Sequence, residues 1–219
     1  MSEARAASAR ERGERRRAQT RTALVRAAQQ LLAEDRTAVP VLEITQLADV
    51  GMGSFYNHFS SKEELFTAAV DDALELQGAL LDAATEGFED PAEAFAHSFR
   101  VVGRVHRVQP RLSRVLLSRG PELIAADRGL APRARRDIAA AIEAGRFTLA
   151  DADIGLLVAG GTAMTLGQAL HDDPTIDDAA YTDRVTRELL VMFGLAPAEA
   201  DRICALPLPD VASGAHLDD

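Results

Sequence analysis

The sequence is poor in cysteine and in aromatic residues. Its 219 residues include one cysteine, Cys204, together with eight phenylalanines, two tyrosines and no tryptophan. A single cysteine excludes an internal disulfide and a cysteine-rich metal site, and it is compatible with a reducing compartment. The scarcity of aromatic side chains, beside abundant alanine and leucine, favours helices over β-sheet.

Further absences bear on location and chemistry. No segment is apolar over the length that spans a bilayer, and the charged N-terminus lacks the apolar stretch of a signal peptide, so we expect a cytoplasmic protein. The sequence has no His-Glu-x-x-His motif, glycine-rich phosphate loop or Glu-x-x-His pair. We therefore expect no catalytic residue, no cofactor and no metal. The run His171-Asp172-Asp173 could bind a metal, although such a run is usually a solvated helix end.

Positive charge is concentrated at the N-terminal end of an acidic chain. The net charge is −10, yet residues 1–62 carry ten Arg or Lys against seven Asp or Glu. Within the first 21 residues there are seven Arg against three Glu. This polarity suits a protein that meets phosphate groups with one end only. Solubility alone can also produce a basic tail on an acidic body.

Residues 41–60 predict two short helices joined by a tight turn, the second helix covering residues 52–58. Phe55 and Phe59 lie four residues apart and point into a core. The outward positions of the second helix combine small residues with hydrogen-bonding tips and no acid: Met52, Gly53, Ser54, Tyr56, Asn57 and His58. Such a surface suits a helix laid against nucleic acid.

Residues 53–65, Gly-Ser-Phe-Tyr-Asn-His-Phe-Ser-Ser-Lys-Glu-Glu-Leu, resemble the Gly-x-x-Tyr-x-His-Phe-x-x-Lys-Glu-x-Leu signature of the tetracycline-repressor (TetR) family of transcriptional regulators. Residues 24–34 are similar to that family's first helix, and the match covers residues 17–75. The resemblance implies a homodimeric repressor that binds a palindromic double-stranded DNA operator and is released by a small-molecule effector. The alternative is a helical protein–protein adaptor that keeps the fold without binding an operator. Salt dependence separates the two, because operator binding falls steeply as salt rises.

The predicted DNA contacts form two groups. The phosphate contacts, three of which follow from the resemblance, are Tyr56, His58 and Lys62, with Ser54, Arg17 and Arg21 added. The base contacts are Met52, Gly53 and Asn57, since methionine can meet a thymine methyl, glycine admits the backbone to the groove, and asparagine pairs with adenine. Each type also has a structural alternative: a solvated lysine, a core histidine, a packed tyrosine or a glycine required by the turn.

Three residues depart from the pattern of the family. Thr45 stands where alanine is usual, and it fits only if its hydroxyl finds a backbone acceptor. Asp49 holds the turn position usually taken by glycine, and aspartate tolerates the left-handed conformation better than most residues. Gly51 replaces a serine or threonine cap, at a cost of a few tenths of a kcal/mol.

Capping residues and apolar periodicity predict an all-α fold of nine to ten helices. The expected ranges are 17–34, 40–47, 52–58, 62–84, 91–108, 110–118, 130–144, 152–170 and 178–193, with a short last helix over 197–205. The caps are Asp90, Asp151 and Asp177, and Ser61 with Glu64 forms a capping box. We expect a basic flexible arm (1–16), a helix-turn-helix DNA-binding domain (17–62) and a helical effector-binding and dimerisation domain (63–219).

The two long C-terminal helices are the candidates for dimerisation. One presents a stripe of mostly small residues and the other apolar bulk, and the predicted interface comprises Leu156, Ala159, Gly160, Ala163, Gly167, Val185, Leu189 and Met192. Small residues allow a second helix to come close. Alternatively, the stripe packs only within the monomer.

An apolar stripe that ends in a histidine marks the candidate effector pocket. Phe95, Phe99, Val102 and His106 lie on one helix face. Leu116, Phe147 and Met164 could line the same cavity or simply fill the core. A histidine in this position could donate to a ligand, although it is more often satisfied by a backbone carbonyl. An apolar cavity indicates a hydrophobic effector of unknown identity.

Overall fold

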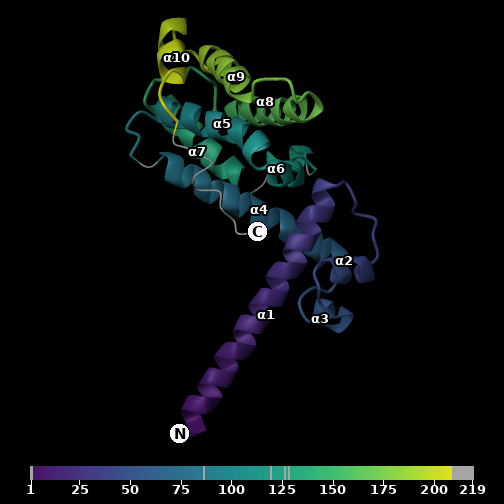
Figure 1. Cartoon of the computed structure of the whole chain (residues 1–219). Helices are drawn as coiled ribbons and strands as arrows, with labels where there is room; N and C mark the ends of the chain where they lie inside the picture. The colour runs from purple at the N-terminus through teal and green to yellow at the C-terminus, as the bar shows by residue number, and fades with distance from the viewer. Residues whose placement is uncertain (1, 86, 119, 126, 128, 209–219) are drawn as a thin grey trace. The chain divides into compact units, whose positions relative to one another are not determined.

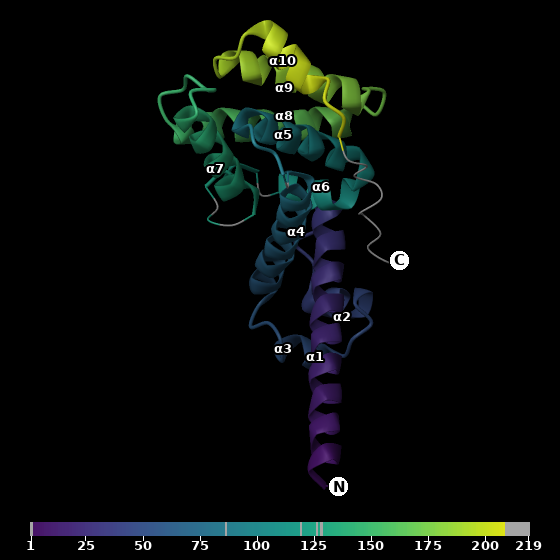
Figure 2. The ribbon, with the colours of Figure 1, turned by 90° about the vertical axis from the view of Figure 1, so that its left-hand side faces the viewer.

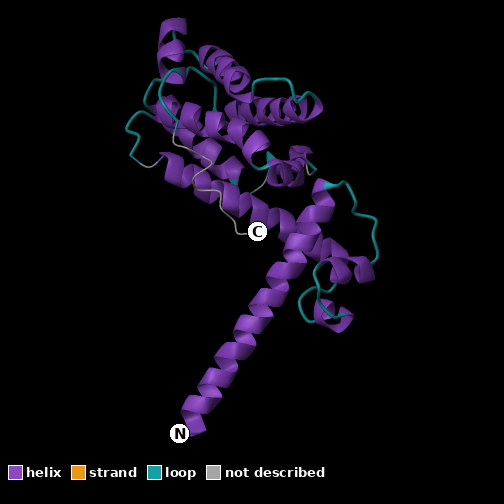
Figure 3. Cartoon of the chain, in the orientation of Figure 1, coloured by secondary structure: helices purple, strands orange, loops and turns teal. Residues whose placement is uncertain are grey.

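The computed structural model describes residues 2–85, 87–118, 120–125, 127 and 129–208. Over these residues every regular element is helical: ten α-helices and one short 3-10 helix, with no strand (Figure 1, Figure 3). The all-α prediction is confirmed. The chain divides into two compact units, Met1–Asp72 and Ala73–Asp219. The division falls within a helix, so that α4 contributes residues to both units.

The first unit contains α1 (Ser2–Ala33), α2 (Val41–Leu47), α3 (Met52–Tyr56) and the beginning of α4 (Lys62–Thr85). The second unit contains the rest of α4 and the remaining elements. These are α5 (Pro91–Val108), α6 (Pro110–Leu117), η1 (Gly120–Leu123), α7 (Leu130–Glu143), α8 (Ala152–Asp172), α9 (Asp178–Met192) and α10 (Pro197–Cys204).

The first helix is longer than the sequence pattern predicts. It begins at Ser2 rather than near Arg17, so the segment expected to be a flexible arm is helical (Figure 2). The side chains of residues 10–19 are exposed, but arginine, alanine and glutamate are strong helix formers, and Glu11 lies four residues before Arg15. Extending a helix that is already packed requires no new nucleation, so propensity alone suffices to continue it.

The core of the first unit joins α1, α2, α3 and α4 around fully buried side chains, among them Leu24, Leu31, Ile44, Phe55 and Leu65. Thr45 is buried here, and its hydroxyl donates to the carbonyl of Leu42 at 2.9 Å, as the pattern required. Asp49 adopts the left-handed conformation, with φ of 52°. Both departures from the family pattern are thus accommodated by local backbone chemistry.

The capping residues act as predicted, with one change of partner. The carboxylates of Asp90, Asp151 and Asp177 each accept a backbone N–H of the first turn of α5, α8 and α9. Ser61 accepts from the backbone N–H of Glu64 at 3.2 Å. The carboxylate of Glu64, however, accepts from the N–H and hydroxyl of Ser60. The capping box is therefore displaced by one residue.

The second unit is organised around α5, which packs against α7, α8 and α9 (Figure 2). Three rings, Phe95, Phe147 and Phe193, pack on one another with centroids 5.2–5.5 Å apart. On the opposite side, Asp183 of α9 accepts from both Arg100 and Arg104 of α5 at 2.8 Å. Both sets of contacts hold α5 against α9 and the residue that follows it.

Candidate nucleic-acid interface and internal cavity

Two buried rings hold α3 and leave its other face in solvent. Phe55 is fully buried and Phe59 is 3% exposed, with the ring centroids 6.1 Å apart. Met52 is 45% exposed and Tyr56 is 62% exposed. The helix ends at Tyr56 rather than His58, although the N–H groups of residues 58 and 59 still bond to the carbonyl of Phe55. All three predicted base contacts lie at exposed positions.

Gly53 is not required by the local fold. Its backbone is not in the left-handed region, and a Cβ added there would meet nothing within 4 Å. The turn therefore does not need a glycine at this position, which removes the structural alternative for Gly53. Open space around an exposed α-carbon leaves room for close approach of another molecule.

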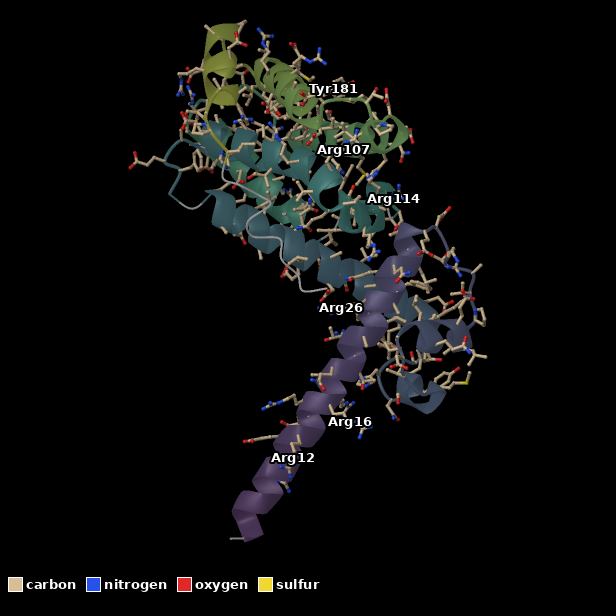
Figure 4. The ribbon with its side chains drawn as sticks, in the orientation of Figure 1. Arg12, Arg16, Arg26, Arg107, Arg114 and Tyr181 are labelled. Atoms are coloured by element: carbon tan, nitrogen blue, oxygen red, sulfur yellow. The ribbon has the colours of Figure 1, made fainter. Side chains whose placement is uncertain are left out.

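Two predicted phosphate contacts on α1 lie beside the end of α3. Arg17 Nη2 donates to the carbonyl of Asn57 at 3.4 Å, and the Arg21 guanidinium lies 5.5 Å from the centroid of the Phe59 ring. Partial burial and these two arginines lower the pKa of His58. Further toward the N-terminus, α1 also carries Arg12 and Arg16 (Figure 4). The surface beside α3 is therefore positively charged although the chain is acidic.

Lys62 lies in a position that neither sequence interpretation describes. It is half-buried, and its Nζ donates to the carbonyls of Thr37 at 3.5 Å and Val39 at 3.4 Å. The lysine thus connects the start of α4 to the loop before α2. Ser54 is half-buried at the first turn of α3. Contact of either residue with phosphate stays a prediction.

The second unit contains a partly open cavity of about 130 Å³. Six of the seven residues predicted to form an effector pocket line it: Phe95, Phe99, Val102, His106, Leu116 and Met164. The seventh, Phe147, is 2% exposed and packs in the core against Phe95 and Phe193. The face of α5 that periodicity selected is therefore the wall of a cavity, whereas Phe147 belongs to the solid part of the core.

The stripe of small residues on α8 faces into the subunit, so a role of these residues in a dimer interface stays a prediction. Four of its members line the cavity: Leu156, Ala159, Gly160 and Ala163. A Cβ at Gly167 would come within 2.4 Å of the His106 ring, and Leu189 of α9 is 2% exposed in the core. The small residues admit helices of the same chain. Of the remaining two, Val185 is half-buried against the core and Met192 is 60% exposed.

α8 also carries exposed apolar residues that the sequence interpretation missed. Ile154 is 48% exposed and Leu157 is 60% exposed. They lie three residues apart on α8, and neither lines the cavity. The available signal was this second apolar pair, which the more regular stripe of small residues obscured.

Two polar atoms on the cavity wall are buried without a partner. Gln77 of α4 is 2% exposed and its Oε1 accepts no hydrogen bond, while the Nε2 of His106 is likewise unpartnered. Buried polar atoms are nearly always hydrogen-bonded, so each of these two atoms is an exception that calls for an explanation. Burial, followed by His171 and Arg107, lowers the pKa of His106 to about 4.

The charged groups of the cavity wall are Arg133 and Asp137 of α7. Arg133 donates from Nε and Nη2 to the carboxylate of Asp82 on α4, at 2.6–3.0 Å, and from Nη1 to the carbonyl of Gly129. Burial raises the pKa of Asp137. The guanidinium is thus already matched within the protein, and the cavity offers a mainly apolar wall with a few neutral polar atoms.

Two residues of the run His171-Asp172-Asp173, at the end of α8, are engaged in hydrogen bonds within the protein. His171 Nε2 lies 2.7 Å from Ser113 Oγ, and the carboxylate of Asp173 accepts from the N–H and hydroxyl of Thr175. Within the part of the chain that the structure describes, no cluster of three histidine, cysteine or acidic side chains could hold a metal ion. Nor does any described helix combine the length and apolarity that crossing a membrane requires.

Two family models match the sequence. Residues 24–69 match the model of bacterial regulatory proteins of the tetR family, and residues 90–205 match the tetracyclin repressor-like C-terminal domain. A search of curated proteins found no match. The first match covers the helix-turn-helix and the second covers most of the unit that contains the cavity.

Solved structures resemble the chain over most of its length. RolR in complex with resorcinol is 35% identical, with a TM-score of 0.68 over 90% of this chain and 99% of RolR. The fatty acid degradation regulator FadR from Bacillus halodurans is 18% identical, with a TM-score of 0.66 over 78% of this chain and 94% of FadR. AibR in complex with isovaleryl coenzyme A and operator DNA is 15% identical, with a TM-score of 0.61 over 78% of this chain and 98% of AibR. The last two show a common fold only.

Proposed function

Because the chain belongs to the TetR family of bacterial transcriptional regulators, we propose that it is a homodimeric repressor that leaves a palindromic operator when a small aromatic compound enters its cavity. The family consists of transcription factors rather than enzymes. The observation that carries the proposal is the largely apolar cavity, two of whose lining residues have an unpartnered polar atom, in a chain 35% identical to a resorcinol-binding regulator.

The first unit would read DNA through α3. The exposed side of that helix carries no acid, and Arg17 and Arg21 lie beside its end. We assign Met52, Gly53 and Asn57 to bases. The phosphate contacts are Ser54, Tyr56, His58, Lys62, Arg17 and Arg21. A helix of this kind reads only a few base pairs, so two copies must lie about one helical turn apart, ~34–36 Å.

Dimerisation would involve the outer face of α8 together with α9. Ile154, Leu157 and Met192 are large apolar side chains that the subunit leaves in solvent. Single exposed apolar residues need no explanation, but three on the two consecutive helices α8 and α9 favour a shared interface. We propose this face as the interface because the small residues of α8 pack within the subunit, and Met192 is common to both predictions.

The effector would act through α4. That helix supplies Leu74, Gln77 and Leu81 to the cavity wall and continues into the first unit. A ligand shifts an equilibrium only by its differential affinity for the two states. We therefore propose that the difference in ligand affinity between the two states arises at the contact between the ligand and α4. We expect the ligand-bound position of α4 to hold the two α3 helices of the dimer out of register.

Selection of bound sites from random duplex DNA by the purified chain tests the proposal. A palindromic product, bound by a dimer and lost on addition of resorcinol, is the expected result. Binding should also weaken steeply as salt rises, since each neutralised phosphate releases counterions. A monomer that ignores duplex DNA in dilute buffer would favour the adaptor instead.

A further inference from the structure

Three side chains form a continuous hydrogen-bonded chain from the cavity to the end of α8. His106 Nδ1 on α5 lies 2.6 Å from Ser113 Oγ on α6, and the same oxygen lies 2.7 Å from His171 Nε2. His106 is 7% exposed and Ser113 is 1% exposed. The Ser113 hydroxyl is therefore bonded to both histidine rings. The imidazole of His106 cannot rotate without breaking its bond to Ser113.

The single proton of the Ser113 hydroxyl sets the tautomer of His106. If the hydroxyl donates to His106 Nδ1, the Nε2 of that ring carries a hydrogen and is a donor. If it donates to His171 instead, His106 Nδ1 carries the hydrogen and Nε2 is an acceptor. In both arrangements each ring is neutral and His106 Nε2 has no partner within the protein. A ligand hydroxyl suits either arrangement, because it donates and accepts.

The cavity is unsuited to an anion. Among the described residues that line it, Arg133 is the cation, and its guanidinium is already matched by Asp82 and the carbonyl of Gly129. Asp137 adds an acid to the same wall. A carboxylate moved into such a site would lose its hydration without gaining a free positive partner. A neutral ligand avoids this cost.

Resting on the proposed function, we propose that His106 anchors a hydroxyl group of a neutral ring compound, that Gln77 Oε1 accepts a second hydroxyl, and that Ser113 and His171 position the His106 ring for this contact. Gln77 and His106 are both more than nine-tenths buried and each presents one unpartnered atom. The apolar remainder of the wall, which includes Phe95, Phe99 and Val102, would cover the faces of the ring. A dihydroxylated ring satisfies both polar atoms, whereas an unsubstituted ring satisfies neither.

The experiment compares three probes, resorcinol, toluene and benzoate, by calorimetric titration of the full-length protein. His106→Phe keeps a ring but removes the polar atoms, and Ser113→Ala removes the positioning hydroxyl. His97→Phe is the matched control: His97 is another buried histidine of α5 with an unpartnered Nε2, but it packs on Phe88 and does not line the cavity. Circular dichroism establishes that each variant is folded.

The wild type should bind resorcinol at least about tenfold more tightly than toluene or benzoate. His106→Phe should lose about tenfold or more for resorcinol with toluene unchanged, Ser113→Ala should lose several-fold, and His97→Phe should match the wild type. Unchanged resorcinol affinity in folded His106→Phe, or preference of the wild type for benzoate, overturns the proposal. If His106→Phe does not fold, Ser113→Ala decides, and unchanged affinity there overturns it.

Failure of the proposed function would look different. A wild type that binds selected DNA but none of the three probes overturns the assignment of His106 and leaves the regulator intact. A wild type that binds resorcinol as described but no duplex DNA supports the assignment and overturns the proposed function.

Discussion

Gly167 lies directly against the imidazole ring of His106. A Cβ at position 167 would come within 2.4 Å of the ring Cε1 and 2.8 Å of Nε2. The ring cannot move aside freely, because its Nδ1 is bonded to Ser113. A glycine that reads in the sequence as part of a dimer stripe is thus a requirement of a buried polar side chain in the same subunit.

Gly167→Ala should therefore damage the cavity. We expect a loss of about 1–3 kcal/mol in the free energy of unfolding, from overpacking, together with weaker binding of resorcinol. Urea unfolding and calorimetric titration measure the two effects. Gly161→Ala on the same helix is the control, since a Cβ there meets nothing within 4 Å, and alanine should leave ligand affinity unchanged. Equal behaviour of the two variants would contradict the assigned contact.

The buried His106 should make stability depend on pH. Burial lowers its pKa from the ordinary 6.5 to about 4, so between these values the unfolded chain binds a proton that the folded chain does not. The stabilisation is fully present above the unfolded pKa and is lost as pH falls toward the folded one, by about 3 kcal/mol for this group.

Urea unfolding of wild type and His106→Phe at about pH 7.5 and about pH 4.5 measures this contribution. The wild type should lose more stability than the variant, because the variant lacks His106. His97 and His171, whose pKa values are also lowered by burial, remain in both proteins and contribute equally to each loss. An identical loss in the two proteins would mean that His106 is not buried in its neutral form.

The substitution Gly53→Ala should change operator affinity without lowering the stability of the fold. Space around the α-carbon is open and the backbone is not left-handed, so alanine should leave stability unchanged or raise it by about 0.5–1 kcal/mol. If the DNA backbone or a base approaches this position, operator affinity should fall by roughly tenfold or more. Thermal melting and fluorescence anisotropy measure the two properties. A variant that is stable and binds its operator normally would remove Gly53 from the interface.

Leu157→Glu tests the outer face of α8. The side chain is 60% exposed in the subunit, so the fold should survive a charge there, while a dimer that buries it should dissociate. Analytical ultracentrifugation is expected to show a monomer, with loss of operator binding. Val108→Glu is the control, because Val108 is 41% exposed on α5. A dimeric Leu157→Glu protein would place the interface elsewhere.

The sequence predicts well those features that depend on near neighbours. Asp90, Asp151 and Asp177 cap helices because their carboxylates need only reach N–H groups two or three residues on. The conformations of Thr45 and Asp49 are likewise local: the Thr45 hydroxyl bonds to a carbonyl three residues earlier, and Asp49 itself adopts the left-handed conformation. The start of α1 was missed because an apolar stripe was required of a helix that propensity alone continues.

Features that depend on distant parts of the chain were less accessible. Periodicity identified the face of α5 that carries Phe99 and His106, but it could not say which helix comes close to Gly160, because small residues admit a partner subunit and a helix of the same chain alike. Gln77 and Arg133 reach the cavity from α4 and α7, and no local pattern in the sequence marks them.

Displacement of a selected operator by resorcinol, followed by fluorescence anisotropy, tests the central claim most directly. With wild-type protein, rising resorcinol should release the DNA, whereas His106→Phe should retain it to concentrations about tenfold higher or more. DNA that stays bound to the wild type while calorimetry shows the cavity filled by resorcinol would contradict the coupling between cavity and operator on which this account rests.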